Sequence, residues 1–244
     1  NFRAGVNAGN SIASGGNYNV VVGDEAGTAI TTGDGNVLLG FNAGDAVTTG
    51  TNNVAIGYLA LSTEDAHGSN VAIGRQALEN QNAGAEAYNV AIGSLAGNDI
   101  TTGVSNTIIG GLAGDAITTA ANNTAVGYSS LGANTTGAGN VAIGRLAGAA
   151  NTTAGSNTFV GERAGLANTT GDESVAVGQF SYSSNTTGVD NVAVGRSALA
   201  ANTTAHNNVA IGRAALTANT TGSENTAVGT SALAANTTAD SNTA

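Results

Sequence analysis

The chain repeats one short pattern of apolar and polar positions from end to end. The run "NVAIGRAALTANTTGSE" from Asn208 to Glu224 follows "NVAVGRSALAANTTAHN" and precedes "NTAVGTSALAANTTADS". Fourteen copies align on the glycine of "NVAIG", with a spacing of 17 residues except for one interval of 18 and one of 19. A fixed period in this range indicates a solenoid in which each copy forms one coil.

Each copy predicts a short strand. Counting its Asn as position 1, positions 2 to 4 are mostly Val, Thr, Ala or Ile, and position 5 is always Gly. Positions 2 and 4 then point to one side of the strand and position 3 to the other. Repeated Gly and Thr-Thr weigh against helix. We predict an all-β fold, a parallel β-solenoid of about fourteen 17-residue coils. Each coil is expected to have two short strands and two turns, around a thin interior of stacked Val, Ile, Ala and Leu.

Two columns of the repeat are candidates for a structural ladder along the solenoid. Stacked Asn side chains at position 1 can hydrogen-bond from coil to coil, and Gly at position 5 ends or bends the strand. The asparagines are Asn19, Asn36, Asn53, Asn70, Asn89, Asn106, Asn123, Asn140, Asn157, Asn191, Asn208 and Asn225. The glycines are Gly23, Gly40, Gly57, Gly74, Gly93, Gly110, Gly127, Gly144, Gly161, Gly178, Gly195, Gly212 and Gly229.

The pattern is irregular in its fourth and fifth copies. Both lack the Thr-Thr pair of positions 13 and 14, and the fifth carries two extra residues. We therefore predict an irregular coil near residues 75–92, with a bulged loop from Glu79 to Tyr88. Position 12 also changes, from Ile or Val in four early copies to Asn in every copy from Asn134 on. We expect residues 1–244 to form a single repeat domain, as a segment of a longer fibre.

The composition excludes several classes of protein. The net charge is −10, with six Arg and no Lys, so the clustered cations of a nucleic-acid-binding protein are missing. A basic amphipathic membrane helix and a run of about 18 apolar residues are missing too, and we expect no direct membrane insertion by this segment. Without Cys the chain has no disulfide framework.

No catalytic, cofactor-binding or metal-binding residues are predicted. His67 and His206 lie eight coils apart, so they cannot share a ligand, and each is expected to be a solvent-facing turn residue. The Asp residues are scattered over several repeat positions, which is unlike a calcium-binding roll. We therefore expect no enzyme activity, although acidic side chains of neighbouring chains can still meet at an interface.

The "NTT" runs fit the acceptor pattern for N-glycosylation. Asn and Thr also form turns through local hydrogen bonds, and we favour this second interpretation because the motif follows the repeat. Thr columns on a flat solenoid suggest ice binding as an alternative function. Adjacent Thr residues of a strand point to opposite faces, so only one outward Thr column is expected.

Position 6 varies most and is expected to face solvent. It holds aromatic and Arg side chains in successive copies, and such side chains are typical anchors of interfaces. The candidate surface-binding residues are Tyr58, Arg75, Tyr128 and Arg145.

The runs "NVAIG", "NTAVG" and "SVAVG" resemble the head repeat of trimeric autotransporter adhesins, the YadA-like head, over essentially the whole chain. The repeat with its longer "NTTG" loop is also similar to that of phage-type tail-fibre proteins. The resemblance implies a left-handed β-roll and a homotrimer. It differs in a coil of 17 residues where the adhesin repeat has about 14, and in Asn where the family often has Ser.

From this resemblance we expect an extracellular structural and adhesive fibre segment, on a cell surface or a virion. It would attach to a cell-surface, matrix or glycan receptor as a homo-oligomer. The alternatives are the shaft of a phage tail fibre, with recognition elsewhere, and an ice-binding β-solenoid.

Overall fold

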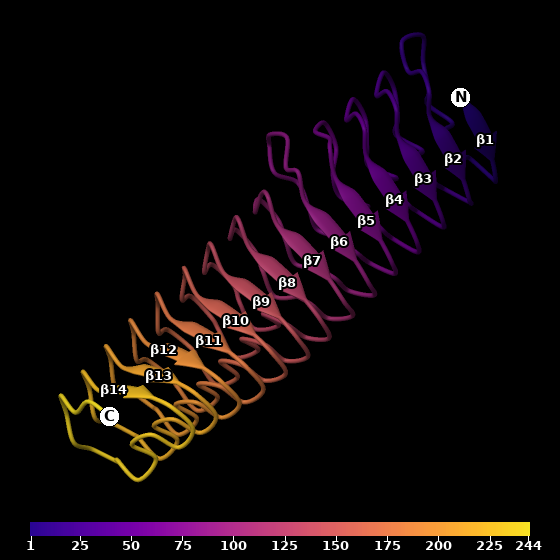
Figure 1. Cartoon of the computed structure of the whole chain (residues 1–244). Coiled ribbons are helices and arrows are strands. Elements are labelled where there is room, and N and C mark those ends of the chain that lie inside the picture. Colours follow the sequence, from indigo (N-terminus) through magenta and orange to yellow (C-terminus); the bar gives the residue numbers. More distant parts are fainter. The chain divides into compact units, whose positions relative to one another are not determined.

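The computed structural model describes all residues from Asn1 to Ala244, which form two compact units, Asn1–Asn122 and Asn123–Ala244. The structure has fourteen strands of three residues each and no helix (Figure 1). The first unit holds β1 (Phe2–Ala4), β2 (Val20–Val22), β3 (Val37–Leu39), β4 (Val54–Ile56), β5 (Val71–Ile73), β6 (Val90–Ile92) and β7 (Thr107–Ile109). The second unit holds β8 (Thr124–Val126), β9 (Val141–Ile143), β10 (Thr158–Val160), β11 (Val175–Val177), β12 (Val192–Val194), β13 (Val209–Ile211) and β14 (Thr226–Val228).

Within each unit, strands that follow one another in sequence pair in parallel. The register advances by one repeat per coil, as in Val37↔Val54 of β3 and β4 and Val192↔Val209 of β12 and β13. The predicted all-β parallel β-solenoid is thus confirmed for both units. Its left-handed sense and its trimeric state stay predictions. We name each coil by its strand.

Only one strand forms in each coil, so the expectation of a second strand was wrong. After the strand the chain turns at positions 6 to 11, as in Arg196–Ala201, and passes through left-handed backbone angles, for example at Ser197 and Leu199. These angles prevent an extended conformation. Backbone hydrogen bonds still join the turns of neighbouring coils, such as Leu131 N–H to the Ala147 carbonyl at 3.0 Å.

The strand faces the interior with its middle residue. Ala55 of β4 and Ala193 of β12 are fully buried, whereas the residues on either side of them are half-buried. The expectation that Val and Ile of the strand fill the interior was therefore wrong for positions 2 and 4. Position 3 faces the interior both where it is Ala and where it is larger, as at Leu38, Ile108 and Phe159, and the side chains of positions 2 and 4 lie on the outer face of the sheet.

Glycine at position 5 is required by the stacking of the coils. Gly57 and Gly178 have φ values of +136° and +130°. A Cβ added to Gly57 would lie 2.5 Å from the carbonyl oxygen of Gly74 in the next coil. Neither the angle nor the space suits any other residue.

The interior is filled by compensating volumes at positions 3, 9 and 12. Where position 9 is Gly, a large side chain occupies the space: a Cβ on Gly165 would lie 2.5 Å from the Phe159 ring, and one on Gly44 would lie 2.7 Å from Leu38. Where position 9 is Leu, as at Leu61 and Leu199, that side chain is itself fully buried. Close packing of this kind explains why position 9 alternates between Leu and Gly.

The two extra residues of the repeat lie between β5 and β6, where the register advances by 19 residues, from Val71 to Val90. The loop between these strands extends beyond the loops of the neighbouring coils (Figure 1). It contains Gly84, whose surroundings are open, and the exposed Tyr88.

Candidate functional site

The outer face of the sheet is apolar in both units. Position 4 carries only Val, Leu or Ile from β2 to β14, and position 2 carries Val or Thr. These side chains remain partly exposed, for example 36% for Ile92, 40% for Ile143 and 41% for Ile211. An apolar face that repeats from coil to coil is larger than scattered surface residues would give, and such faces mark sites of association.

The flank of the first unit carries two of the predicted surface-binding residues at position 6. Tyr58 is 49% exposed and stacks on Phe41 of the preceding coil, with ring centroids 5.7 Å apart and an interplanar angle of 11°. Arg75 of the next coil hydrogen-bonds to the side chain of its neighbour Gln76. The ring of Tyr58 thus packs against the ring of Phe41, and the guanidinium of Arg75 is held by a hydrogen bond to the adjacent residue.

The flank of the second unit carries the other two predicted surface-binding residues, Tyr128 and Arg145. Tyr128 is 54% exposed, whereas Arg145 donates to Glu162 of the next coil and forms an ion pair with it. The hydrogen bond from Arg145 lowers the pKa of the Glu162 carboxyl, and a second one from Gln179 acts in the same direction. Of these four residues, Tyr128 offers an exposed aromatic ring and Arg145 has its charge compensated.

The Asn side chains at position 1 are buried inside the coils. The backbone N–H of Asn53 donates to Oδ1 of Asn36 at 3.0 Å, and that of Asn208 donates to Oδ1 of Asn191 at 3.0 Å. Their Nδ2 groups reach across the coil to the carbonyl at position 15, as from Asn208 to Gly222 at 2.9 Å. Each of these side chains therefore joins two coils and closes its own, except that of Asn70, whose Nδ2 has no hydrogen-bond partner. Ser174 takes the place of Asn in the β11 coil and donates no such bond across it.

A second buried Asn column runs through the second unit at position 12. Asn151 donates from Nδ2 to Oδ1 of Asn134 at 3.0 Å, and the bond repeats in every following coil to Asn236. The six asparagines from Asn134 to Asn219 are fully buried. These "NTT" asparagines are thus inaccessible to a glycosyl donor in the folded chain, which agrees with their interpretation as turn residues.

The two Thr residues of each "NTT" run differ in environment. The hydroxyl of the first donates to the carbonyl of the next coil, as from Thr152 to Thr169 at 3.0 Å. The second, such as Thr153, is exposed. A coil that has the Thr-Thr pair therefore presents chiefly its second Thr to solvent.

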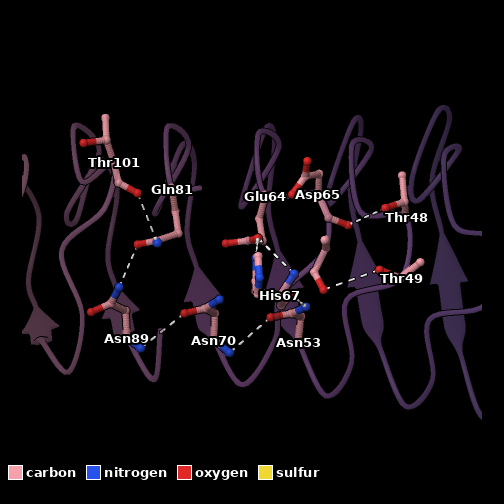
Figure 2. Close-up of polar contacts among 11 residues, drawn as sticks. Thr48, Thr49, Asn53, Glu64, Asp65, His67, Asn70, Gln81, Asn89 and Thr101 are labelled. Atoms are coloured by element: carbon pink, nitrogen blue, oxygen red, sulfur yellow. Dashed lines mark hydrogen bonds and ion pairs between the residues drawn. The ribbon is translucent and has the colours of Figure 1, made fainter. Parts of the chain in front are cut away.

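An irregular polar cluster lies at the corner of the β4 coil (Figure 2). Glu64 occupies position 12 and is fully buried, and its Oε1 accepts the backbone N–H of His67 at 3.2 Å. Nδ1 of His67 lies 3.6 Å from the same oxygen. Three buried atoms here lack a hydrogen-bond partner, namely Oε2 of Glu64, Nδ1 of His67 and Nδ2 of Asn70. Burial raises the pKa of the Glu64 carboxyl, and the hydrogen bond from His67 opposes the shift in part.

The interpretation of His67 as a solvent-facing turn residue was wrong, whereas His206 is exposed as expected. The side chain of His67 is 28% exposed, and its ring turns toward Glu64. The sequence held a signal for this cluster. Glu64 stands at position 12, where most other copies have Ile, Val or Asn, and His67 stands at position 15 of the same copy, where most others have Gly or Ala. Two departures in one copy indicate residues that face each other inside one coil.

Comparison with protein-family models, curated proteins and solved structures found no match to this chain. The structure contains no helix long and apolar enough to cross a membrane.

Proposed function

We propose that this chain is a segment of an extracellular structural and adhesive fibre, in which three copies associate through the outer faces of their sheets. The observation that carries the proposal is the exposed apolar face formed by positions 2 and 4. In each unit this face repeats from coil to coil. A second copy of the chain is a suitable occupant, because it presents the same repeating apolar face with the same period. Closed cyclic symmetry then buries all the faces around one axis.

The fibre role is supported by the way in which the fold is held together. Within each unit the coils bond to their neighbours through backbone and buried side-chain hydrogen bonds, which suits a long element under load. We propose no enzyme activity, and we place adhesion on the flanks at position 6. The exposed rings of Tyr58 and Tyr128 are the candidate contacts there for a cell-surface, matrix or glycan receptor.

The test is the mass of the chain in solution, measured by light scattering. We expect about three times the monomer mass of 23.4 kDa. Ile143→Glu and Val177→Glu place charges on the outer face and are expected to reduce the mass to that of a monomer, with the far-UV circular dichroism unchanged. Thr153→Glu, at an exposed turn position, is the matched control and retains the mass of the trimer. A monomeric wild-type chain would overturn the assembly.

The alternatives remain a phage tail-fibre shaft and an ice-binding solenoid. Both are separable from the adhesive segment by experiment. A shaft binds no receptor through Tyr58 or Tyr128, so substitution of both by Ala leaves cell binding unchanged. Ice binding requires thermal hysteresis by the purified chain. Because a coil that has the Thr-Thr pair presents chiefly its second Thr to solvent, this alternative has less support.

A further inference from the structure

The corner of the β4 coil gathers three side chains that ligate metal ions. Glu64, Asp65 and His67 each offer one ligand atom, and these atoms lie within 4.8 Å of one another. Acidic side chains often lie close together on protein surfaces without binding an ion, so the short distances between these three residues do not by themselves indicate a metal site. The decisive residue is Glu64, because its carboxylate is fully buried and its Oε2 has no hydrogen-bond partner.

The carboxylate of Glu64 and the ring of His67 face each other without a hydrogen bond between them. Nδ1 of His67 is buried, lies 3.6 Å from Oε1 of Glu64, and has no hydrogen-bond partner (Figure 2). Two ligand atoms held by one tetrahedral Zn²⁺ lie about 3.3–3.6 Å apart, given metal–ligand distances of about 2.0–2.2 Å. The gap between Nδ1 and Oε1 is therefore the gap that one bound cation spans.

A bound cation would also stabilise the ionised form of the buried Glu64 carboxylate. A buried carboxylate is costly unless it is paired or coordinated to a metal, and the only ion pair recorded for Glu64 is the long contact with His67. The chain has no Lys. Asp65, the third candidate ligand, is exposed, so its side chain can turn toward an ion at the corner of the coil.

We propose that Glu64, Asp65 and His67 bind one Zn²⁺ ion, with the fourth position open to water. The imidazole ligand disfavours Ca²⁺ and Mg²⁺, which prefer oxygen ligands only, whereas Zn²⁺ accepts the combination of nitrogen and carboxylate oxygen.

The backbone around the site is already ordered by the neighbouring residues. The carbonyl of Asp65 accepts the hydroxyl of Thr48 at 2.8 Å, and the carbonyl of His67 accepts Nδ2 of Asn53 at 3.1 Å. These contacts hold the backbone from which the side chains of Asp65 and His67 project. The ion would fasten positions 12 and 15 of a coil that has Glu in place of the Asn or apolar residue found at position 12 in most coils.

The experiment is a calorimetric titration of the full chain with ZnCl₂ after treatment with a chelator. We expect one ion per chain, and a loss of affinity of at least about tenfold for Glu64→Gln and for His67→Asn. Glu64→Gln is suited to the fold because Gln81 fills position 12 of the next coil. Circular dichroism checks that both variants fold.

His206→Asn is the matched control, since it removes the other histidine of the chain and is expected to bind Zn²⁺ like the wild type. The melting temperature in the presence of Zn²⁺ gives a second readout, with a rise for the wild type and none for Glu64→Gln. The site is overturned if the wild type binds no Zn²⁺ at about 100 μM, or if either ligand variant keeps full affinity. Tighter binding of Ca²⁺ than of Zn²⁺ would overturn the assignment of the ion.

Discussion

The two units fill the same interior column, position 12, in different ways. In the second unit every coil has Asn there, and Nδ2 donates to the preceding Oδ1 over distances of 2.7 to 3.3 Å. In the first unit the column begins with the half-buried Ile12 and continues with the fully buried Ile30, Val47, Glu64, Gln81, Ile100 and Ile117. A uniform Asn column supplies its own hydrogen-bond donors and acceptors, because each side-chain amide has an identical partner in the preceding and in the following coil. A mixed column cannot do this where apolar and polar residues meet.

The two units also differ in the number of buried polar atoms that lack a hydrogen-bond partner. Those of the first unit belong to Asn42, Asp45, Glu64, His67 and Asn70, whereas the second unit has only Nε of Arg163. Each such atom costs about 1–3 kcal/mol of stability when it stays without a partner. We therefore expect the first unit to be the less stable of the two and to exchange its amide hydrogens first.

The largest effect is expected from the same glycine substitution in each unit. Gly57→Ala and Gly178→Ala introduce a Cβ less than 3 Å from backbone of the next coil, at φ values near +130°. We expect each to lower the free energy of unfolding by about 4 kcal/mol. Hydrogen exchange measured by mass spectrometry should show opening confined to the first unit for Gly57→Ala.

Gly84→Ala is the control for this pair. Gly84 also has a positive φ, of +68°, but a Cβ there would meet nothing within 4 Å. Gly84→Ala is expected to lower the free energy of unfolding by about 1 kcal/mol, because only the backbone angle is unfavourable for Ala there. Equal losses for Gly57→Ala and Gly84→Ala would show that the contact between coils is not what requires glycine.

A second substitution introduces the mixed column of the first unit into the second. Asn168→Val places at position 12 the residue of the native Val47, whose coil also combines a large side chain at position 3 (Leu38, where this coil has Phe159) with Gly at position 9. The change leaves Oδ1 of Asn151 without its donor and Nδ2 of Asn185 without one acceptor. We expect a loss of about 2–3 kcal/mol in urea denaturation. An unchanged midpoint would mean that the Asn column contributes nothing to stability.

The polar interior of the second unit also predicts a dependence on pH in the alkaline range. Tyr182 is fully buried at position 9, and its hydroxyl donates to the Gly188 carbonyl at 2.8 Å. Burial raises its pKa from 10.0 to about 12, although hydrogen bonds from its neighbours oppose the shift. The folded state therefore holds the phenol proton more tightly than the unfolded chain does. Its stabilising contribution is complete below pH 10 and is lost as the pH rises toward 12.

The expected fall in the free energy of unfolding is about 1.4 kcal/mol per pH unit within that window. Urea denaturation between pH 9 and 11 measures the fall. Tyr182→Phe should remove that part of the slope, and the difference in absorbance at 295 nm between the two proteins should report the phenol. A slope that is the same in both proteins would assign the dependence to another group.

The period, the glycine column and the solenoid itself could be predicted from the sequence, because each coil contacts only its neighbours and the pattern is local. The inward face of the strand could not be predicted from alternation alone. Alternation separates Ala55 from Val54 and Ile56, but it does not say which set faces the interior, and the larger apolar side chains of Val54 and Ile56 favoured the wrong one. The number of strands could not be predicted either. The residues with left-handed backbone angles at positions 7 and 9 include Leu and Arg, and these residue types give no sign of such angles in the sequence.

The register of the ladders has a consequence for how the length of such a chain can change. A coil inserted or removed as a whole leaves every backbone and Asn bond in place, because each strand meets a strand one repeat away. A change of one or two residues has to be absorbed in a loop, as between β5 and β6. Recombination between copies of the repeat in the gene therefore lengthens or shortens the folded protein in steps of 17 codons, and misaligned events are selected against by the stacking itself.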